Sequence, residues 1–238
     1  MTIDLETKVG DIVLTWPQAL RYLENQGVDY CCGGHRTLRE ACEVAGRDPL
    51  QMLEGLKAAE APAIGAASPQ VWLGASLTAL MAHIEATHHA YLRFELPRLE
   101  MLLEKVLNAH GENHPELDEV FDHLQALTSD MMPHLMKEEQ ILYPFIRQME
   151  AGGEIKACFA TVQSPIHVME SEHVVVGDLL AKLRAVTGGY TTPADGCATF
   201  KALYDGLRDL EADTHLHIYL ENQILHPRAV QMEASVLG

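Results

Sequence analysis

One chemically distinctive pattern occurs twice in this sequence. A His is followed four residues later by Glu and then by x-Gln-Ile-Leu-x-Pro, first over residues 134–144 and again over 217–227. Residues four apart lie on one face of a helix, with Cβ atoms about 6 Å apart. Each copy therefore offers an imidazole and a carboxylate to one point beside its helix. Together, the two copies predict a metal site that includes His134, Glu138, His217 and Glu221.

The residues around each copy indicate that these side chains face a core. Apolar residues lead up to each pair in steps of four and three, which is the stripe of a buried helix face. Burying an unpaired carboxylate costs several kcal/mol, so two of them in one core need either cations or dense hydrogen bonding, and a pair of metal ions would meet that need. The predicted stripes are Val120, Leu124, Leu127, Met131, His134, Glu138 and Ile141, and then Leu203, Leu207, Leu210, Thr214, His217, Glu221 and Ile224.

Two further helices each contribute one His to the predicted core. His173 lies on a stripe with Ile166 and Met169. Near residue 88 the periodicity fits two stripes equally well, one through His88 and one through His89. His89 precedes His134 by 45 residues and His173 precedes His217 by 44, a spacing that favours His89 slightly.

These positions add up to four imidazoles and two carboxylates. A carboxylate has two oxygens and can bridge, so Glu138 and Glu221 are the natural links between two metal ions. Six ligands leave open positions for an oxo or hydroxo bridge and for small ligands; ligand type alone allows zinc, manganese or iron. A lone His on an apolar face is more often a core residue than a ligand, and it is the repetition that favours a metal. The other His are assigned to the surface or an outer layer (His35, His110, His114, His123, His215, His226) or stay undecided (His83, His167).

Four long amphipathic stretches supply the elements that hold this site. We predict helices over about 72–109, 115–150, 160–187 and 194–233, without the alternation of a half-buried strand. Short connections predict an up-down-up-down four-helix bundle over 72–238. Residues 1–60 predict a small helical domain: Thr15-Trp16-Pro17 starts a helix that stops at Gly27, and further helices follow over 37–45 and 48–60. Residues 61–71, rich in small residues and proline, predict a linker.

Composition limits the partners and the compartment. The formal net charge of -17 disfavours nucleic acids and anionic membranes as partners. No stretch has the apolar length of a membrane helix or the pattern of a signal peptide, so we expect a cytoplasmic protein. Five cysteines, an odd number, indicate reduced thiols. Cys42, Cys158 and Cys197 fit packing roles. The adjacent Cys31 and Cys32, in a Gly-rich loop, fit either reactive thiols or a structural turn.

At these residues the sequence resembles the hemerythrin-like di-iron proteins, and more specifically the RIC (repair of iron centres) family. The segments that carry the resemblance are Asp29-Tyr-Cys-Cys-Gly-Gly34, His134-Leu-Met-Lys-Glu138, Met169-Glu-Ser-Glu-His173 and His217-Ile-Tyr-Leu-Glu221. The resemblance implies a hemerythrin-like bundle after a small domain with vicinal cysteines, and a functional role for Cys31 and Cys32. It implies two non-haem iron ions held by His89, His134, Glu138, His173, His217 and Glu221, so it selects His89 over His88. This chain departs from the family pattern in having His226 before Pro227 and a longer linker.

The resemblance also implies a function. A protein of this family is expected to repair damaged iron-sulfur proteins after nitrosative or oxidative stress by supplying iron. The alternative is binding, sensing or reduction of nitric oxide at the same centre, with nitric oxide or dioxygen as small ligands. Whether the protein is an enzyme, and whether it forms a homodimer, stays open at this level.

Overall fold

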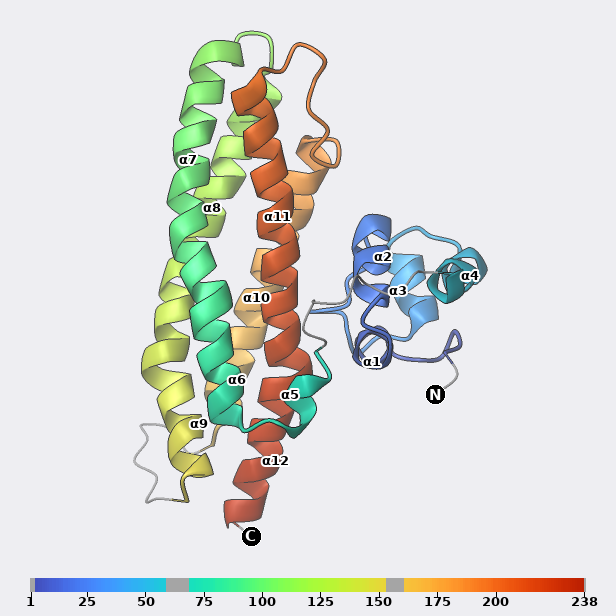
Figure 1. The fold of residues 1–238 in the computed structure, drawn as a ribbon, viewed down its shortest axis with the longest axis vertical. Helices are drawn as coiled ribbons and strands as arrows, with labels where there is room; N and C mark the ends of the chain where they lie inside the picture. The colour runs from blue at the N-terminus through green and yellow to red at the C-terminus, as the bar shows by residue number, and fades with distance from the viewer. Residues whose placement is uncertain (1–2, 59–68, 153–160, 238) are drawn as a thin grey trace.

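The computed structural model describes residues 3–58, 69–152 and 161–237, and in these ranges the chain is helical and forms no strand. A long helical bundle carries a smaller helical unit against one side (Figure 1). The all-α prediction is confirmed. Most of the predicted linker over 61–71, and also Cys158, lie outside the described residues. Within those ranges, none of the helices combines the length and the apolar character that crossing a membrane requires.

Seven α-helices build the four arms of the bundle. The arms are α6 (Leu77–Ile84) with α7 (Ala90–His110), α8 (Glu116–Lys137) with α9 (Tyr143–Glu150), α10 (Gln163–Val186), and α11 (Ala198–Leu220) with α12 (His226–Leu237). Helix α8 packs against α7 and α10, and α11 packs against the same two helices. The second and fourth arms, which carry the repeated motif, therefore lie diagonally across the core.

Three arms are interrupted by a π-helical turn, in which one extra residue is accommodated. These turns are η1 (Glu85–His89), η2 (Glu138–Leu142) and η3 (Glu221–Leu225), so the repeated Glu-x-Gln-Ile-Leu segment is the π turn itself in both copies. The extra residue shifts the helical register. Ile141, predicted in the core, is therefore 44% exposed, and Leu142 is buried in its place.

The first predicted helix, over 72–109, is wrong at its start. A separate short helix α5 (Val71–Gly74) ends before the bundle, and Ala75 has an extended backbone. Ser76 then caps α6, its side chain accepting a hydrogen bond from the Ala79 N–H at 3.1 Å, the usual role of serine at a helix N-terminus. The Arg228 guanidinium fixes this corner by donating to the carbonyls of Trp72 and Ala75.

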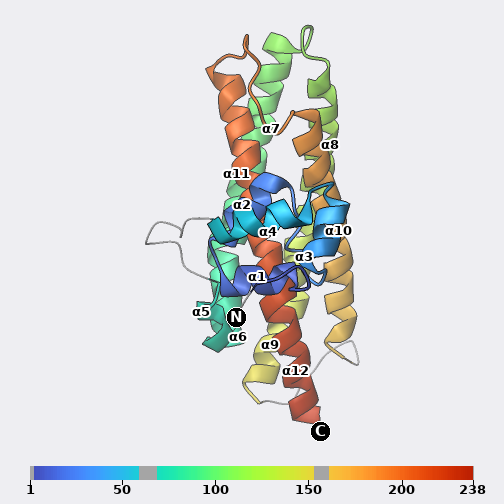
Figure 2. The same ribbon diagram turned by 90° about the vertical axis from the view of Figure 1, so that its right-hand side faces the viewer.

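The smaller unit consists of α1 (Val9–Thr15), α2 (Ala19–Gln26), α3 (Leu38–Val44) and α4 (Pro49–Ala58). Helix α2 ends where predicted, because Gly27 adopts φ 70°, a conformation that glycine accommodates without strain. Thr37 and Glu40 form a reciprocal capping box at α3. Figure 2 shows this unit in front of α10 and α11.

One side chain of the bundle reaches into the smaller unit. Gln223, in η3, donates from Nε2 to the Cys31 carbonyl at 3.2 Å. A Cβ at Gly34 would lie 2.5 Å from the Gln223 amide and 2.6 Å from the Tyr30 carbonyl, and a Cβ at Gly10 would lie 2.6 Å from the Gln223 amide, so a side chain at either position would displace Gln223. The smaller unit therefore packs directly on a π turn of the bundle.

Candidate metal centre

The six predicted ligands meet in the middle of the bundle. Their side chains form two groups of four, and within each group one ligand atom per residue lies within 4.8 Å of all the others. All six residues have no exposed surface. We call His89 and His217 the first half of the site, and His134 and His173 the second half; both groups include Glu138 and Glu221.

In each half, two imidazole nitrogens face one point. The Nε2 atoms of His89 and His217 are 3.3 Å apart, and those of His134 and His173 are 3.1 Å apart. His89 and His217 come from neighbouring arms, as do His134 and His173. The four helices of the bundle therefore converge pairwise on two positions.

The two carboxylates test whether metal ions fit there. Within the described residues neither oxygen of Glu138 accepts a hydrogen bond, and Oε2 of Glu221 also lacks one. The other Glu221 oxygen accepts a hydrogen bond from the Tyr143 hydroxyl at 2.5 Å. Imidazole nitrogens lie close to these oxygens, 3.0 Å away for His134 and Glu138 and 3.1 Å away for His173 and Glu221, but buried carboxylate oxygens without hydrogen bonds are costly unless cations balance them. These orphaned oxygens, surrounded by imidazole nitrogens, fit bound metal ions.

The electrostatics of the metal-free cluster differ from residue to residue. Burial by itself lowers the pKa of His134, but Glu138 outweighs it and raises that pKa to about 9. Burial and the charge of Glu221 act to raise the pKa of Glu138, yet His134 and His89 hold it below its ordinary value. Burial lowers the pKa of His217. In the absence of metal, protonated imidazoles such as that of His134 supply part of the positive charge that balances the two carboxylates.

Three ligands have a hydrogen-bonded partner on the far side of the imidazole ring. Such partners fix the tautomer and aim Nε2 at the metal position. The contacts are His89 Nδ1 to Glu139 Oε1 at 2.7 Å, His134 Nδ1 to Glu172 Oε2 at 2.8 Å, and His173 Nδ1 to Asn222 Oδ1 at 2.9 Å. The sequence reasoning missed these partners, although each is the immediate neighbour of a predicted ligand. By contrast, Nδ1 of His217 is buried without a partner among the described residues.

Two further His lie directly behind the ligands. Both His88 and His89 are buried, because the π turn η1 brings them to the inner side, but only His89 belongs to a ligand group. His88 bonds through Nδ1 to Asp213 at 2.9 Å and stacks on His217 with ring centroids 5.6 Å apart. His226 is likewise buried, with its ring parallel to that of His173 at 6.1 Å. Periodicity could not separate His88 from His89 because both face inward.

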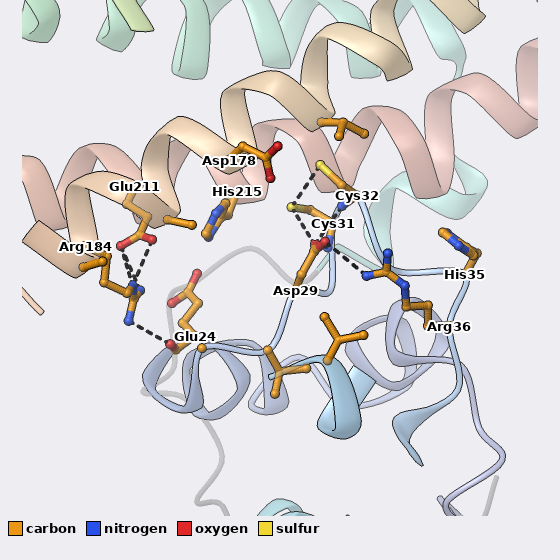
Figure 3. A pocket seen from close by; sticks show the side chains of 17 residues that line it. Glu24, Asp29, Cys31, Cys32, His35, Arg36, Asp178, Arg184, Glu211 and His215 are labelled. Carbon is orange, nitrogen blue, oxygen red and sulfur yellow. Dashed lines mark hydrogen bonds and ion pairs between the residues drawn. The ribbon is translucent and has the colours of Figure 1, made fainter. Parts of the chain in front are cut away.

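The vicinal cysteines lie next to the second half of the site. The sulfurs of Cys31 and Cys32 are 3.9 Å apart, and both thiols line a cavity between the smaller unit and the bundle (Figure 3). Cys32 Sγ donates to the backbone carbonyl of His173 at 3.4 Å. The structure therefore brings the thiol loop within contact of a predicted ligand residue.

The two other described cysteines, Cys42 and Cys197, differ in burial. Cys42 is buried, as its predicted packing role requires. Cys197 is exposed, so its predicted packing role is wrong: it is the residue immediately before α11. Hydrogen bonds from the Phe200 N–H and from His110 lower the pKa of Cys197 to about 7.

Comparison with known families assigns both parts of the molecule. The sequence profile of the hemerythrin HHE cation binding domain matches residues 80–229, which include all six residues of the cluster. A second profile, described as a domain of unknown function (DUF542), matches residues 5–60. The bundle and its buried His and Glu residues thus define a hemerythrin-like cation-binding protein.

Similar proteins narrow the class. The chain is 35% identical over 225 residues to the iron-sulfur cluster repair protein YtfE of Enterobacter sp. (strain 638), and over 227 residues to YtfE of Escherichia coli O157:H7. YtfE of Escherichia fergusonii is 35% identical over 229 residues. Each match covers 94% of this chain and 97% of the relative. The chain belongs to this family of hemerythrin-like iron-sulfur cluster repair proteins.

Proposed function

We propose that this protein repairs damaged iron-sulfur clusters by supplying iron from two ions held between His89, His134, Glu138, His173, His217 and Glu221. The observation that carries the proposal is the pair of ligand groups that share both carboxylates. Glu138 and Glu221, which belong to both groups, would each hold both ions, and an oxo or hydroxo group would be a further shared ligand. Each half then adds two imidazoles of its own.

The ligands of the proposed site are suited to binding iron that is later released. Four neutral imidazoles and two carboxylates, without a thiolate, compensate the charge of two ferrous ions less fully than an oxygen-rich site would. When bound, the iron supplies the cargo for repair and positions for a small ligand. The relatives are named as iron-sulfur cluster repair proteins, which supports damaged iron-sulfur proteins as the partners.

The surrounding residues regulate access and retention. The cluster has no exposed surface, so iron is protected from water until helices move apart. Tyr143 donates to Glu221 and holds that carboxylate toward the metal positions. Three imidazoles are held in orientation by Glu139, Glu172 and Asn222. This support raises the affinity of the site for iron and so slows the release of iron.

Iron transfer is the direct test. The diferrous protein would be mixed anaerobically with an iron-sulfur dehydratase whose cluster has lost iron, with a chelator present that traps free ferrous iron. We expect dehydratase activity to return with the loaded protein and to stay low with the same amount of ferrous salt. Recovery no better than with ferrous salt would contradict the proposal.

Matched variants locate the source of the iron. His134→Ala should lose both the iron and the repair, measured by metal analysis and Mössbauer spectroscopy. Glu95→Gln is the control, because Glu95 is a buried carboxylate of the same bundle that pairs with Arg98 and belongs to neither ligand group. Two irons per wild-type chain are expected; fewer than one would contradict the bridged pair.

A further inference from the structure

The thiol of Cys32 is connected to the proposed iron site through a single residue. Its sulfur donates to the backbone carbonyl of His173 at 3.4 Å, while the imidazole of His173 lies with Nε2 3.1 Å from Glu221 Oε2. Only one hydrogen bond and the covalent bonds of His173 separate the sulfur from the metal position. A path this short suits the movement of electrons better than the movement of an ion, because the backbone of α10 lies between.

The neighbouring groups are arranged to handle protons. Asp29 Oδ1 accepts hydrogen bonds from Cys31 Sγ at 3.3 Å and from the N–H groups of Cys31 and Cys32 at 3.0 Å and 2.9 Å. The hydrogen bond with Cys32 and burial raise the pKa of Cys31, so its thiol keeps its proton in the resting protein. Asp29, which is exposed, offers that proton a way to solvent.

We propose that Cys31 and Cys32 form an internal two-electron reductant for iron in the adjacent site. This rests on the proposed function. The two S–H bonds break and one S–S bond forms, the sulfurs closing from 3.9 Å to about 2 Å. Two protons leave, that of Cys31 by way of Asp29 and that of Cys32 to solvent in the cavity that Cys32 lines, and two electrons pass to two ferric ions, which become ferrous. Lower charge on the ions weakens their attraction to Glu138 and Glu221, so reduction loosens the iron for delivery.

A cavity beside the sulfurs suits the return of the disulfide to thiols. It has a volume of about 510 Å³ and is lined by both cysteines and by charged groups that include Asp29, Arg36 and Arg184 (Figure 3). A low-molecular-weight thiol carrying carboxylate and amino groups matches that lining. Two such thiols restore the dithiol by exchange and leave as their own disulfide, so atoms and electrons balance.

The test follows iron and thiols together. The protein, loaded with two ferric ions and with its cysteines reduced, is incubated anaerobically with a chelator specific for ferrous iron and without any other reductant. We expect two ferrous ions per chain in the chelator and a loss of two hydrogens from the protein mass, mapped to a Cys31–Cys32 disulfide. Ferrous release without this disulfide would overturn the proposal.

Variants separate an electron donor from a structural loop. Cys32→Ser and Cys31→Ser should slow ferrous release by more than tenfold, whereas Cys197→Ser, which removes an exposed thiol far along the chain, should release iron as the wild type does. A Cβ at Gly177 would lie 3.6 Å from Cys32 Sγ, so Gly177→Leu should push the sulfur away from His173 while keeping both thiols. Release at the wild-type rate by Gly177→Leu, with native helicity, would count against the path.

A second arm distinguishes this proposal from the proposed function. Cys32→Ser protein that has been reduced with dithionite should still supply iron to the damaged dehydratase. If it does so while failing to release iron from the ferric form, both proposals hold. If dithionite-reduced Cys32→Ser supplies no iron but wild type does, the cysteines handle iron itself and the reductant role is wrong. If neither supplies iron, the repair function fails, and the anaerobic disulfide measurement still decides the reductant role.

Discussion

The two halves of the iron site have equivalent ligands but different supports. In the second half, His134 and His173 each have an Nδ1 partner, Glu172 and Asn222. In the first half, His89 has Glu139 but His217 has no Nδ1 partner among the described residues. An unsupported imidazole is a weaker and less oriented ligand. In the proposed two-iron centre, the residues around the duplicated motif therefore make the two halves unequal, and the first half should release iron first.

The largest effect is expected from removing a carboxylate that both halves share, because both halves should then lose their iron. Glu138→Gln should lower bound iron from about two per chain to nearly none, because Glu138 belongs to both ligand groups. In the metal-free protein the same change removes the charge partner of His134, whose pKa Glu138 raises to about 9, so the metal-free variant should be less stable than the metal-free wild type at pH 7. Metal analysis and thermal unfolding of the metal-free proteins check both parts. One retained iron would mean that the halves do not share this residue.

Removing the hydrogen-bond partner of one ligand imidazole should speed the release of iron from only the half that contains this ligand. Glu172→Gln should speed iron loss from the second half by about 10- to 100-fold, the usual cost of losing such a partner. Release to a chelator, followed over time, should then change from two phases toward one. Glu139→Gln is the matched variant for the first half and should widen the gap between the phases. Equal effects of both variants on both phases would contradict independent halves.

The pH dependence of metal binding should come from His134 in the second half and His89 in the first, because Glu138 raises the pKa of both. His134, with a pKa raised to about 9, has to lose a proton before Nε2 can bind a metal, so affinity should rise by about tenfold per pH unit from 7 and level off near 9. His217, with a lowered pKa, should add no rise in that range. Calorimetry with zinc, in buffers of different ionisation enthalpy, counts the released protons. A flat profile would contradict this assignment.

The smallest changes in iron affinity are expected at the two residues that precede the prolines of the repeated motif, Tyr143 and His226. Tyr143→Phe removes the hydrogen bond to Glu221 and should weaken iron binding by about fivefold, or about 1 kcal/mol. His226→Phe keeps a flat ring against His173 and removes no hydrogen bond within the described residues, so less than a twofold change is expected. Competition with a chelator of known affinity measures both. A larger effect of His226→Phe than of Tyr143→Phe would contradict this ranking.

The sequence predicted the architecture and the inward-facing residues well, because apolar periodicity reports directly on burial. Glu138, His173 and the repeated pairs could be identified on that basis, whereas His89 needed a family resemblance. Periodicity failed where the helix departs from 3.6 residues per turn: the π turns bury both His88 and His89 and expose Ile141. It also carries no information about hydrogen bonds between arms, so Glu172 and Asn222 were missed, and Cys197 was misplaced because a helix end has no inner face.

The π turns also limit how such a chain can change in length. Each turn amounts to one residue inserted into an α-helix, and deleting that residue would rotate everything beyond it by about 100° and draw it back by about 1.5 Å. A deletion within 221–225 would turn the whole of α12 away from its neighbours and carry Gln223 out of the space between Gly10 and Gly34. We therefore expect substitutions, but not insertions or deletions, to be tolerated within 85–89, 138–142 and 221–225. In these segments the structure should constrain the number of residues as well as their identity.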